Sequence, residues 1–446
     1  MGALEMFRSL TREQRNTLIA CFLGWALDAF DFFLLTFVIV PMAKDFGTSI
    51  TNLSYAITLT LALRPVGAFI FGLLGDRFGR RIPLMVDIVF YSVMELLTAF
   101  APNYTMLLVF RALYGIGMGG EWGLGASLAM ESLPTASRGL FSGILQQGYA
   151  FGYLLAALVY GLVYPFFGWR GLFVAGALPA GLVIFMRARV PESPAWSRPK
   201  HGRAFWITVA RELALPSGIL LLAVFGFLHG YRLAAVMVVI VGVILAIVLK
   251  PKHWLLFFYV ILLMTAFNAM SHGTQDMYQT FLGEQLGLGV TAKSAIGIIY
   301  AIGAISGGTI IGHISQKLGR RRSIMAAAAF GILLIPLWIF SPALSLLVLG
   351  GFGMQFMVQG AWGIVPVHLN ELSPAELRGT FPGFAYQLGN LLAANTAVIE
   401  AKLAERFADA AGRPDYAKAL ALFALVIFVA LIVIAAIGRE HRGKKF

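Results

Sequence analysis

The 446-residue sequence contains a single cysteine, Cys21, and only 12% charged residues. One cysteine excludes an intramolecular disulfide and a metal site built from several thiolates. The chain also lacks the GxxxxGK[ST] phosphate loop, the HExxH zinc motif, a CxxC pair and any convincing nucleophile motif. These absences argue against ATP-driven chemistry and against an enzyme, and we expect no cofactor and no bound metal.

Apolar residues are abundant instead. They make up 59% of the chain, and the mean hydropathy is +0.82. Stretches of roughly 17 to 25 apolar residues, the length that crosses a bilayer, recur along the whole sequence. A soluble domain would carry roughly twice the charge. We therefore predict an all-α polytopic membrane protein without a cleaved signal peptide.

The apolar segments form two groups of six with an insert between them. The first group is predicted at 16–40, 54–75, 83–101, 105–129, 138–165 and 170–187, and the second at 254–283, 294–314, 324–340, 344–368, 378–400 and 417–437. Two shorter pieces, 213–228 and 231–249, lie between the groups. They either cross the membrane, giving 14 spans, or form a surface hairpin, giving 12; we favour crossing.

The basic residues predict the orientation of these helices. With a cytoplasmic N-terminus, 24 Lys and Arg residues lie on the inner side, 8 outside, and Arg64 and Arg111 within helices, which accounts for all 34. The opposite topology would violate the positive-inside rule. The net charge of +13 is thus a topology signal and a lipid-facing inner surface, and we expect no nucleic-acid partner.

An internal repeat with an offset of 240 residues relates the two groups. Residues 72–81 read GLLGDRFGRR and residues 312–321 read GHISQKLGRR; Trp122 likewise matches Trp362, and Gln147 matches Gln387. Two parallel six-helix halves form the plan of a two-bundle secondary transporter. We assign 1–190 and 253–446 to the halves and 191–252 to a cytoplasmic linker with the two extra helices.

These repeated segments also carry a family resemblance. The GDRFGRR loop at 75–81, its weaker copy at 316–321, and PESPAW at 191–196 resemble the major facilitator superfamily over nearly the whole chain. Residues 27–32, Arg64 and residues 117–123 look like the sialate:proton symporter group. The two extra central helices are also similar to those of bacterial sialate transporters.

The most polar intramembrane run is Asn268 to Thr280, which reads NAMSHGTQDMYQT. Such a cluster normally faces a water-accessible cavity, because polar groups in hydrocarbon are costly. The run fits the pattern N-x-x-[ST]-H-x-[ST]-Q-D-x-x-x-T of the fungal Jen-type lactate and pyruvate permeases at every fixed position. The resemblance implies a proton-coupled monocarboxylate symporter, although Glu121 and the central insert depart from those permeases.

Helical spacing places Asn268, His272 and Gln275 of this run on one face, with Asp276 on its flank. We expect the first three to contact substrate. His272 titrates near physiological pH, and Asp276 is a candidate proton carrier. The alternative is a polar network that only packs this helix against a neighbour.

Two arginines lie inside predicted helices. Arg111 is the natural anion-binding residue, because a guanidinium grips a carboxylate bidentately. Its alternative is a structural ion pair with a buried acid, namely Asp28, Asp31, Glu95 or Glu121. For Arg64 we favour a structural pair with an acid of the first helix.

Further candidates lie on other helices. Asp28, Asp31 and Glu121 are proton-coupling candidates that would otherwise serve the buried arginines or packing, and Gln387 is a neutral substrate contact. Tyr278, Trp122 and Trp362 either line the cavity or pack. By family resemblance, cytoplasmic latches that gate transport are expected at Asp76, Arg77, Arg80, Arg81, Arg138, Arg320 and Arg378.

Together these features predict an importer that carries a small carboxylate such as lactate or pyruvate with a proton by alternating access. The alternatives are a symporter of sialate or another larger organic acid and, less favoured, a transporter-like sensor. We expect a monomer in a bacterial inner membrane, with both termini cytoplasmic.

Overall fold

The computed structural model of the chain describes residues 3–48, 50–196 and 202–443, and the secondary structure it gives them is helical. The first group comprises α1 (Ala3–Ser9), α2 (Arg12–Asp45), α3 (Ile50–Phe78), α4 (Arg81–Ala99), α5 (Tyr104–Ser132), α6 (Arg138–Gln146) and α7 (Gly148–Ala188). The linker holds α8 (Arg203–Val209), a π-helical turn (Ala210–Ala214), α9 (Leu215–Leu228) and α10 (Arg232–Leu249).

The second group contains the remaining helices. They are α11 (Trp254–Gln275), α12 (Tyr278–Thr280), a π-helical turn (Phe281–Gln285), α13 (Val290–Leu318), α14 (Arg320–Ile339), α15 (Leu344–Trp362), α16 (Val365–Leu372), a 3-10 turn (Ala375–Leu377), α17 (Phe381–Ala393), α18 (Thr396–Arg406) and α19 (Tyr416–Ile437). The predicted segments match these helices to within a few residues at most ends.

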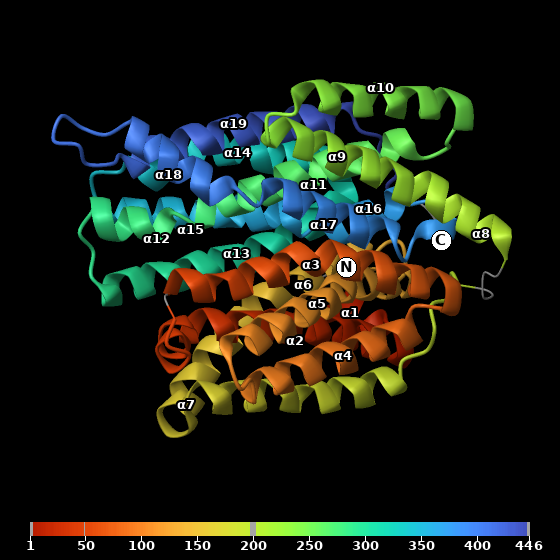
Figure 1. Cartoon of the computed structure of the whole chain (residues 1–446), viewed down its shortest axis with the longest axis horizontal. Helices are drawn as coiled ribbons and strands as arrows, with labels where there is room; N and C mark the ends of the chain where they lie inside the picture. The colour runs from red at the N-terminus through yellow and green to blue at the C-terminus, as the bar shows by residue number, and fades with distance from the viewer. Residues whose placement is uncertain (1–2, 49, 197–201, 444–446) are drawn as a thin grey trace.

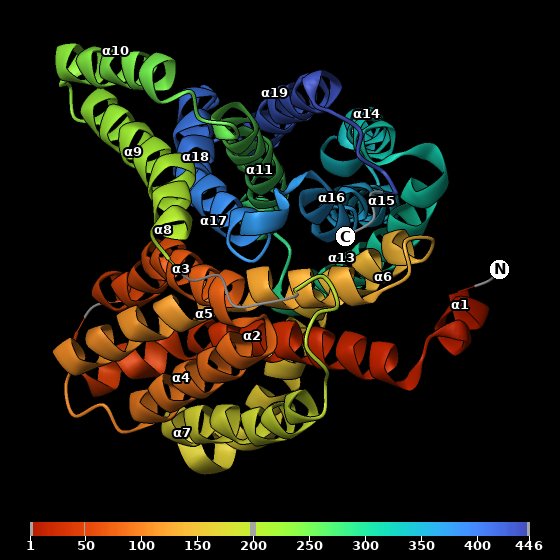
Figure 2. The ribbon, with the colours of Figure 1, turned by 90° about the vertical axis from the view of Figure 1, so that its right-hand side faces the viewer.

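The helices assemble into two bundles that lie side by side. Figure 1 shows α2 to α7 in red to yellow below and α11 to α19 in green to blue above, with the helices running in roughly one direction. The view along this direction in Figure 2 shows the same separation. Within α7 the chain reverses at Gly168, whose φ of +61° is readily adopted only by glycine.

The two extra helices lie at the edge of the second bundle, where α9 and α10 form a hairpin (Figures 1 and 2). Residues 204–228 and Arg232–Leu249 are long and apolar enough to cross a membrane. Ten helices of the described chain meet this test, or eleven with one bent pair. The predicted total of 14 spans remains a prediction.

One end of the molecule, here called the basic end, carries the loops between α3 and α4, α5 and α6, α13 and α14, and α16 and α17. At this end, an acidic residue that follows the last long helix of each bundle caps the N-terminus of another helix in the same bundle. Glu192 accepts from the backbone N–H of Arg80 at 2.7 Å and of Arg81 at 3.1 Å. Glu440 accepts from those of Arg320 and Arg321 at 3.2 and 3.1 Å. A carboxylate satisfies the free N–H groups and positive dipole of a helix N-terminus.

The bundles touch most closely where glycines face each other near the basic end. A Cβ atom on Gly123 of α5 would lie 2.9 Å from the Cα atom of Gly383 of α17. The repeat-related Gly143 and Gly363 both face the backbone of Gly308. Small residues allow such backbone approach between membrane helices.

This contact generates a prediction with a matched control on the same helix. A Cβ atom on Gly125 would meet its nearest neighbour at 3.9 Å, which is ordinary contact. Alanine favours a helix by up to about 1 kcal/mol over glycine. Gly125→Ala should therefore keep or raise the thermal midpoint of the detergent-purified protein, whereas Gly123→Ala should lower it and slow transport. Equal midpoints for the two variants would contradict this packing.

Candidate substrate and proton site

The polar run of the seventh long helix lies where that helix is interrupted. Helix α11 ends at Gln275, and the chain passes through Asp276 and Met277 before α12 begins. His272 Nδ1 lies 3.1 Å from Asp276 Oδ2, so these two side chains, four residues apart, are hydrogen-bonded along one face.

His272 and Asp276 are the exposed members of the run. Their side chains are 39% and 37% exposed although they lie between the bundles. Asn390 of α17 is within hydrogen-bonding reach of His272, and Arg64 of α3 is within electrostatic range of it. Tyr149 of α7 lies within electrostatic range of both Arg64 and Asp276. Polar groups of both bundles therefore surround this solvent-accessible position of His272 and Asp276, here called the polar opening.

The other predicted members of the run pack helices together. Gln275 donates through Nε2 to Gln355 Oε1 of α15 at 3.0 Å, and Gln355 donates to Thr274 Oγ1 at 3.3 Å. Asn268 is buried and donates to the backbone carbonyl of Met264 at 2.7 Å. Gln275 thus bonds toward α15, whereas Asp276 bonds His272, and a substrate contact at Gln275 or Asn268 remains a prediction.

Arg64 carries an unpaired guanidinium at the interface. The side chain is 4% exposed, and its Nε and Nη2 atoms find no hydrogen-bond partner among the described residues. Asp28 and Tyr386 lie within its electrostatic range. Because a buried cation without a hydrogen-bonded anion is costly, the position favours an incoming anion. The predicted structural pair with an acid of the first long helix is not formed as a direct contact.

Arg111 has the opposite environment. Its Nη1 atom lies 2.6 Å from Glu95 Oε2, both side chains are fully buried, and the guanidinium sits 4.0 Å above the ring of Tyr114. This geometry corrects the prediction that Arg111 contacts substrate and supports its alternative, a structural ion pair. Glu95, one of the four acids named as candidates for that pair, is the partner.

The remaining acids of the first bundle form a buried cluster. Glu121 Oε1 lies 2.7 Å from Arg187 Nη2, in space that Gly24 leaves open. Asp28 is fully buried and its two carboxylate oxygens have no hydrogen-bond partner among the described residues, as is also true of Asp87. Asp31 is 2% exposed. Sequence reasoning missed Arg187, counted as a loop residue, and Asp87.

Gln387 and the three aromatic candidates, Trp122, Trp362 and Tyr278, are also buried. Gln387 is 1% exposed, and its amide has no partner among the described residues. Trp122 and Trp362 flank Tyr386 with ring centroids 4.7 and 5.6 Å away. Tyr278 stacks on Tyr300 at 4.9 Å inside the second bundle. The three aromatic candidates therefore act in packing.

The basic end ties the two bundles together through Asp76. Its carboxylate accepts from the N–H groups of Gly379 and Thr380 at 2.7 and 2.9 Å and from the Thr380 hydroxyl at 2.7 Å. The repeat-related Gln316 accepts from Gly139 N–H at 3.2 Å. These contacts bridge the bundles.

The predicted gating arginines surround these contacts. Arg80 pairs with Asp76 at 3.0 Å and with Glu131 at 3.2 Å, and Arg378 reaches Glu131 at 3.7 Å across the interface. Arg320 pairs with Glu371 at 3.1 Å within its own bundle. The others contact neighbours locally: Arg77 lies 5.6 Å above the Trp206 ring, Arg81 donates to the Ala188 carbonyl, and Arg138 donates to the Leu133 carbonyl at 3.1 Å.

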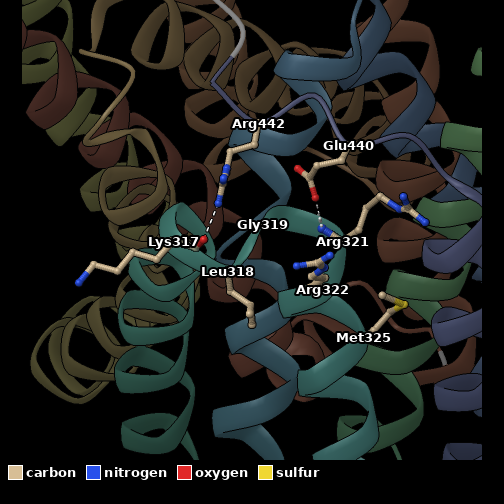
Figure 3. A pocket seen from close by; sticks show the side chains of 8 residues that line it. All are labelled: Lys317, Leu318, Gly319, Arg321, Arg322, Met325, Glu440 and Arg442. Atoms are coloured by element: carbon tan, nitrogen blue, oxygen red, sulfur yellow. Dashed lines mark hydrogen bonds between the residues drawn. The ribbon is translucent and has the colours of Figure 1, made fainter.

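A cavity of about 590 Å³ also lies at the basic end, away from the site between the bundles. Figure 3 shows the side chains of Arg321, Arg322 and Arg442 around it, with Glu440 bonded to the backbone N–H of Arg321. Arg442 donates to the carbonyl of Lys317, and Arg321 donates to that of Ala435 at 2.7 Å. These cations thus cap helix ends and are separate from the polar opening.

The sequence profile of the Major Facilitator Superfamily matches residues 21–397. The chain belongs to this superfamily. It is therefore a multi-pass membrane transporter and not an enzyme, as the sequence predicted. The crystal structure of the proton:xylose symporter XylE superposes with a TM-score of 0.71 at 18% identity, covering 97% of each chain. At that identity the likeness shows the fold alone.

Curated relatives of this superfamily member share more of its sequence. A carboxylic acid transporter protein homolog of Saccharomyces cerevisiae is 30% identical over 99% of this chain and 71% of its own length. A probable 4-methylmuconolactone transporter of Cupriavidus pinatubonensis is 27% identical, covering 88% of this chain and 84% of its own. The sialic acid transporter NanX of Escherichia coli is 26% identical, covering 87% and 86%.

The Glu95–Arg111 pair generates a second prediction. Removing one partner of a buried pair leaves an uncompensated charge and costs about 3–5 kcal/mol. Glu95→Gln and Arg111→Gln should each lower the thermal midpoint strongly, and the double variant should recover much of the loss. A stable Arg111→Gln protein with weakened substrate affinity would instead restore Arg111 as an anion-binding residue.

Proposed function

We propose that this transporter is a proton-coupled symporter of small monocarboxylates such as lactate or pyruvate. The observation that carries the proposal is the buried Arg64 guanidinium of the first bundle, whose Nε and Nη2 atoms have no hydrogen-bond partner among the described residues. It lies within electrostatic range of His272 of the second bundle. The name of the 30% identical yeast relative, a carboxylic acid transporter homolog, supports the same substrate class.

In this proposal Arg64 grips the substrate carboxylate bidentately, while His272 and the amides of Asn390 and Gln387 are the neighbouring hydrogen-bonding groups. A bound anion satisfies the buried guanidinium, which otherwise lacks a hydrogen-bonded partner. The site is closed only when both bundles contribute. Substrate binding therefore draws the bundles together on the side opposite the basic end.

Proton coupling follows from the same charges. Asp276 is bonded to His272 and exposed to the polar opening, so its protonation would free His272 to donate to the substrate. Asp28 lies within electrostatic range of Arg64. An anion that pairs with Arg64 would weaken the attraction between Arg64 and Asp28, and would therefore favour protonation of Asp28. Asp31 and Glu121 lie deeper in the first bundle, and we assign them secondary roles.

The contacts of Asp76 at the basic end would act as the inner gate. They hold the bundles together there while His272 and Asp276 remain exposed on the other side of the contact, as an outward-facing transporter requires. The excess of Lys and Arg supports an orientation with the basic end and both termini in the cytoplasm, and we propose a bacterial inner membrane as the location.

Uptake of radiolabelled L-lactate into proteoliposomes tests the proposal. We expect accumulation when an inward proton gradient is imposed and none when the gradient is collapsed. Excess unlabelled sialate in the same assay distinguishes the alternative substrate, a larger organic acid, because the NanX relative transports sialic acid by name. Failure of folded protein to take up lactate, with uptake of sialate, would overturn the monocarboxylate assignment.

Arg64→Gln should abolish saturable lactate binding while leaving the thermal midpoint unchanged or higher, because the variant removes a buried charge that has no hydrogen-bonded partner. The matched control is Arg111→Gln, which should lose stability instead. Lactate binding measured by calorimetry that survives Arg64→Gln would remove Arg64 from the site.

Asp276→Asn should keep the helix break and hydrogen-bonding capacity but lose the titrating group. We expect lactate uptake by this variant to lose its rise with falling external pH. Uptake with the wild-type pH dependence would exclude Asp276 from the proton path.

A further inference from the structure

A second acid of the carboxyl-terminal bundle lies behind the proposed site. Glu400 belongs to α18 and has no exposed surface, and neither of its carboxyl oxygens has a hydrogen-bond partner among the described residues. A Cβ atom on Gly273 would lie 3.2 Å from Glu400 Oε1. The Glu400 carboxyl group therefore faces α11 at the residue that follows His272.

The elements around Glu400 define its electrostatic surroundings. Helix α18 packs against α11 and α19. From α11 the charged neighbour that acts on Glu400 is Asp276. The apolar ring of Phe423, from α19, covers Gly273. Tyr300, from α13, lies within electrostatic range of Glu400 and carries a hydroxyl group. Glu400 is thus an acid that faces another acid and an apolar ring.

Such an acid is stable in its neutral form. An ionised carboxylate without hydrogen bonds in an apolar interior is strongly disfavoured, and a carboxylate nearby adds like-charge repulsion. Asp276, in contrast, lies 3.1 Å from the His272 ring, and its side chain is 37% exposed. The two carboxyl groups, which act on each other electrostatically, therefore have opposite environments: Asp276 is solvent-accessible and Glu400 is buried.

We propose that Glu400 carries the symported proton while the transporter switches between its outward-facing and inward-facing states. The proton enters through the polar opening onto Asp276 and passes to Glu400, so that one O–H bond breaks on Asp276 and one forms on Glu400. Asp276 is then again ionised and paired with His272. This inference rests on the proposed proton-coupled function and names the residue that stores the proton.

Gly273 is the structural feature that permits this transfer. A side chain at this position would collide with Phe423 and with Glu400, so glycine keeps α11 and α18 close. The same closeness excludes water from Glu400. The proton is thereby shielded until Asp276 is exposed on the other side of the membrane.

The test uses the full-length protein with Glu400→Gln, because glutamine resembles the protonated carboxyl group in shape and charge. We expect this variant to fold, to exchange labelled for unlabelled lactate across proteoliposome membranes, and to lose accumulation driven by a proton gradient, so that the ratio of inside to outside lactate falls to unity. Glu405→Gln, an exposed position on the same helix, is the matched control and should behave as wild type.

Infrared difference spectroscopy provides a readout that a structural role would not change. A component of the carbonyl stretch that belongs to protonated Glu400 should be present near neutral pH in the wild type and in Glu405→Gln and absent in Glu400→Gln. Components from other buried carboxyl groups, such as Asp28 and Asp87, should remain in all three proteins. Absence of the Glu400 component from the wild type, or gradient-driven accumulation by Glu400→Gln at the wild-type level, would overturn the assignment. A wild-type protein that exchanges lactate without accumulating it would overturn the proton-coupled function itself, and the assignment with it.

Discussion

Charged side chains inside an apolar helical bundle need partners, and this constraint organises the interior of the transporter. Glu95 holds Arg111 and Glu121 holds Arg187 through contacts of 2.6 and 2.7 Å. Such pairs do little for net stability but would be costly to break. Against this background a group without a hydrogen-bonded partner indicates a binding function. Arg64 is such a cation, and it lies at the interface between the bundles.

The internal repeat extends to individual ion pairs between side chains. Arg80 pairs with Glu131 in the first bundle, and residues 240 positions later, Arg320 and Glu371, repeat that pair in the second. The two bundles differ at the residue that reaches across the interface, which is the charged Asp76 in one and the neutral Gln316 in the other. The first bundle therefore makes the stronger, charge-assisted contact.

The two bundles also contribute different kinds of charged group to the proposed substrate and proton site. The first bundle contributes Arg64, a fixed positive charge, whereas the second contributes His272 and Asp276, whose charges change with protonation. In the proposed function, neither bundle alone holds a complete site for an anion and a proton. Coupling between the two solutes would then follow from bringing the two bundles together.

The sequence predicted the helices and the two-bundle plan because apolar length and a shared repeat report them directly. It also located the His272–Asp276 region, since polar residues are rare in such helices. The ion pairs were less predictable. Arg111 and Arg64 are both intramembrane arginines, and only the positions of Glu95 and the bundle interface in space distinguish a paired guanidinium from an available one. Arg187 and Glu400 lie near predicted helix ends, where a charged residue normally marks only the end of a membrane-spanning segment.

The central claim is that an anion and a proton bind together between the two bundles. The most direct test is to titrate purified transporter with L-lactate in weakly buffered solution and to follow proton uptake with a pH-sensitive dye. The account predicts that protons are taken up in proportion to the lactate bound, and that Arg64→Gln takes up neither. Saturable lactate binding by the wild type with no proton uptake across the neutral pH range would contradict it.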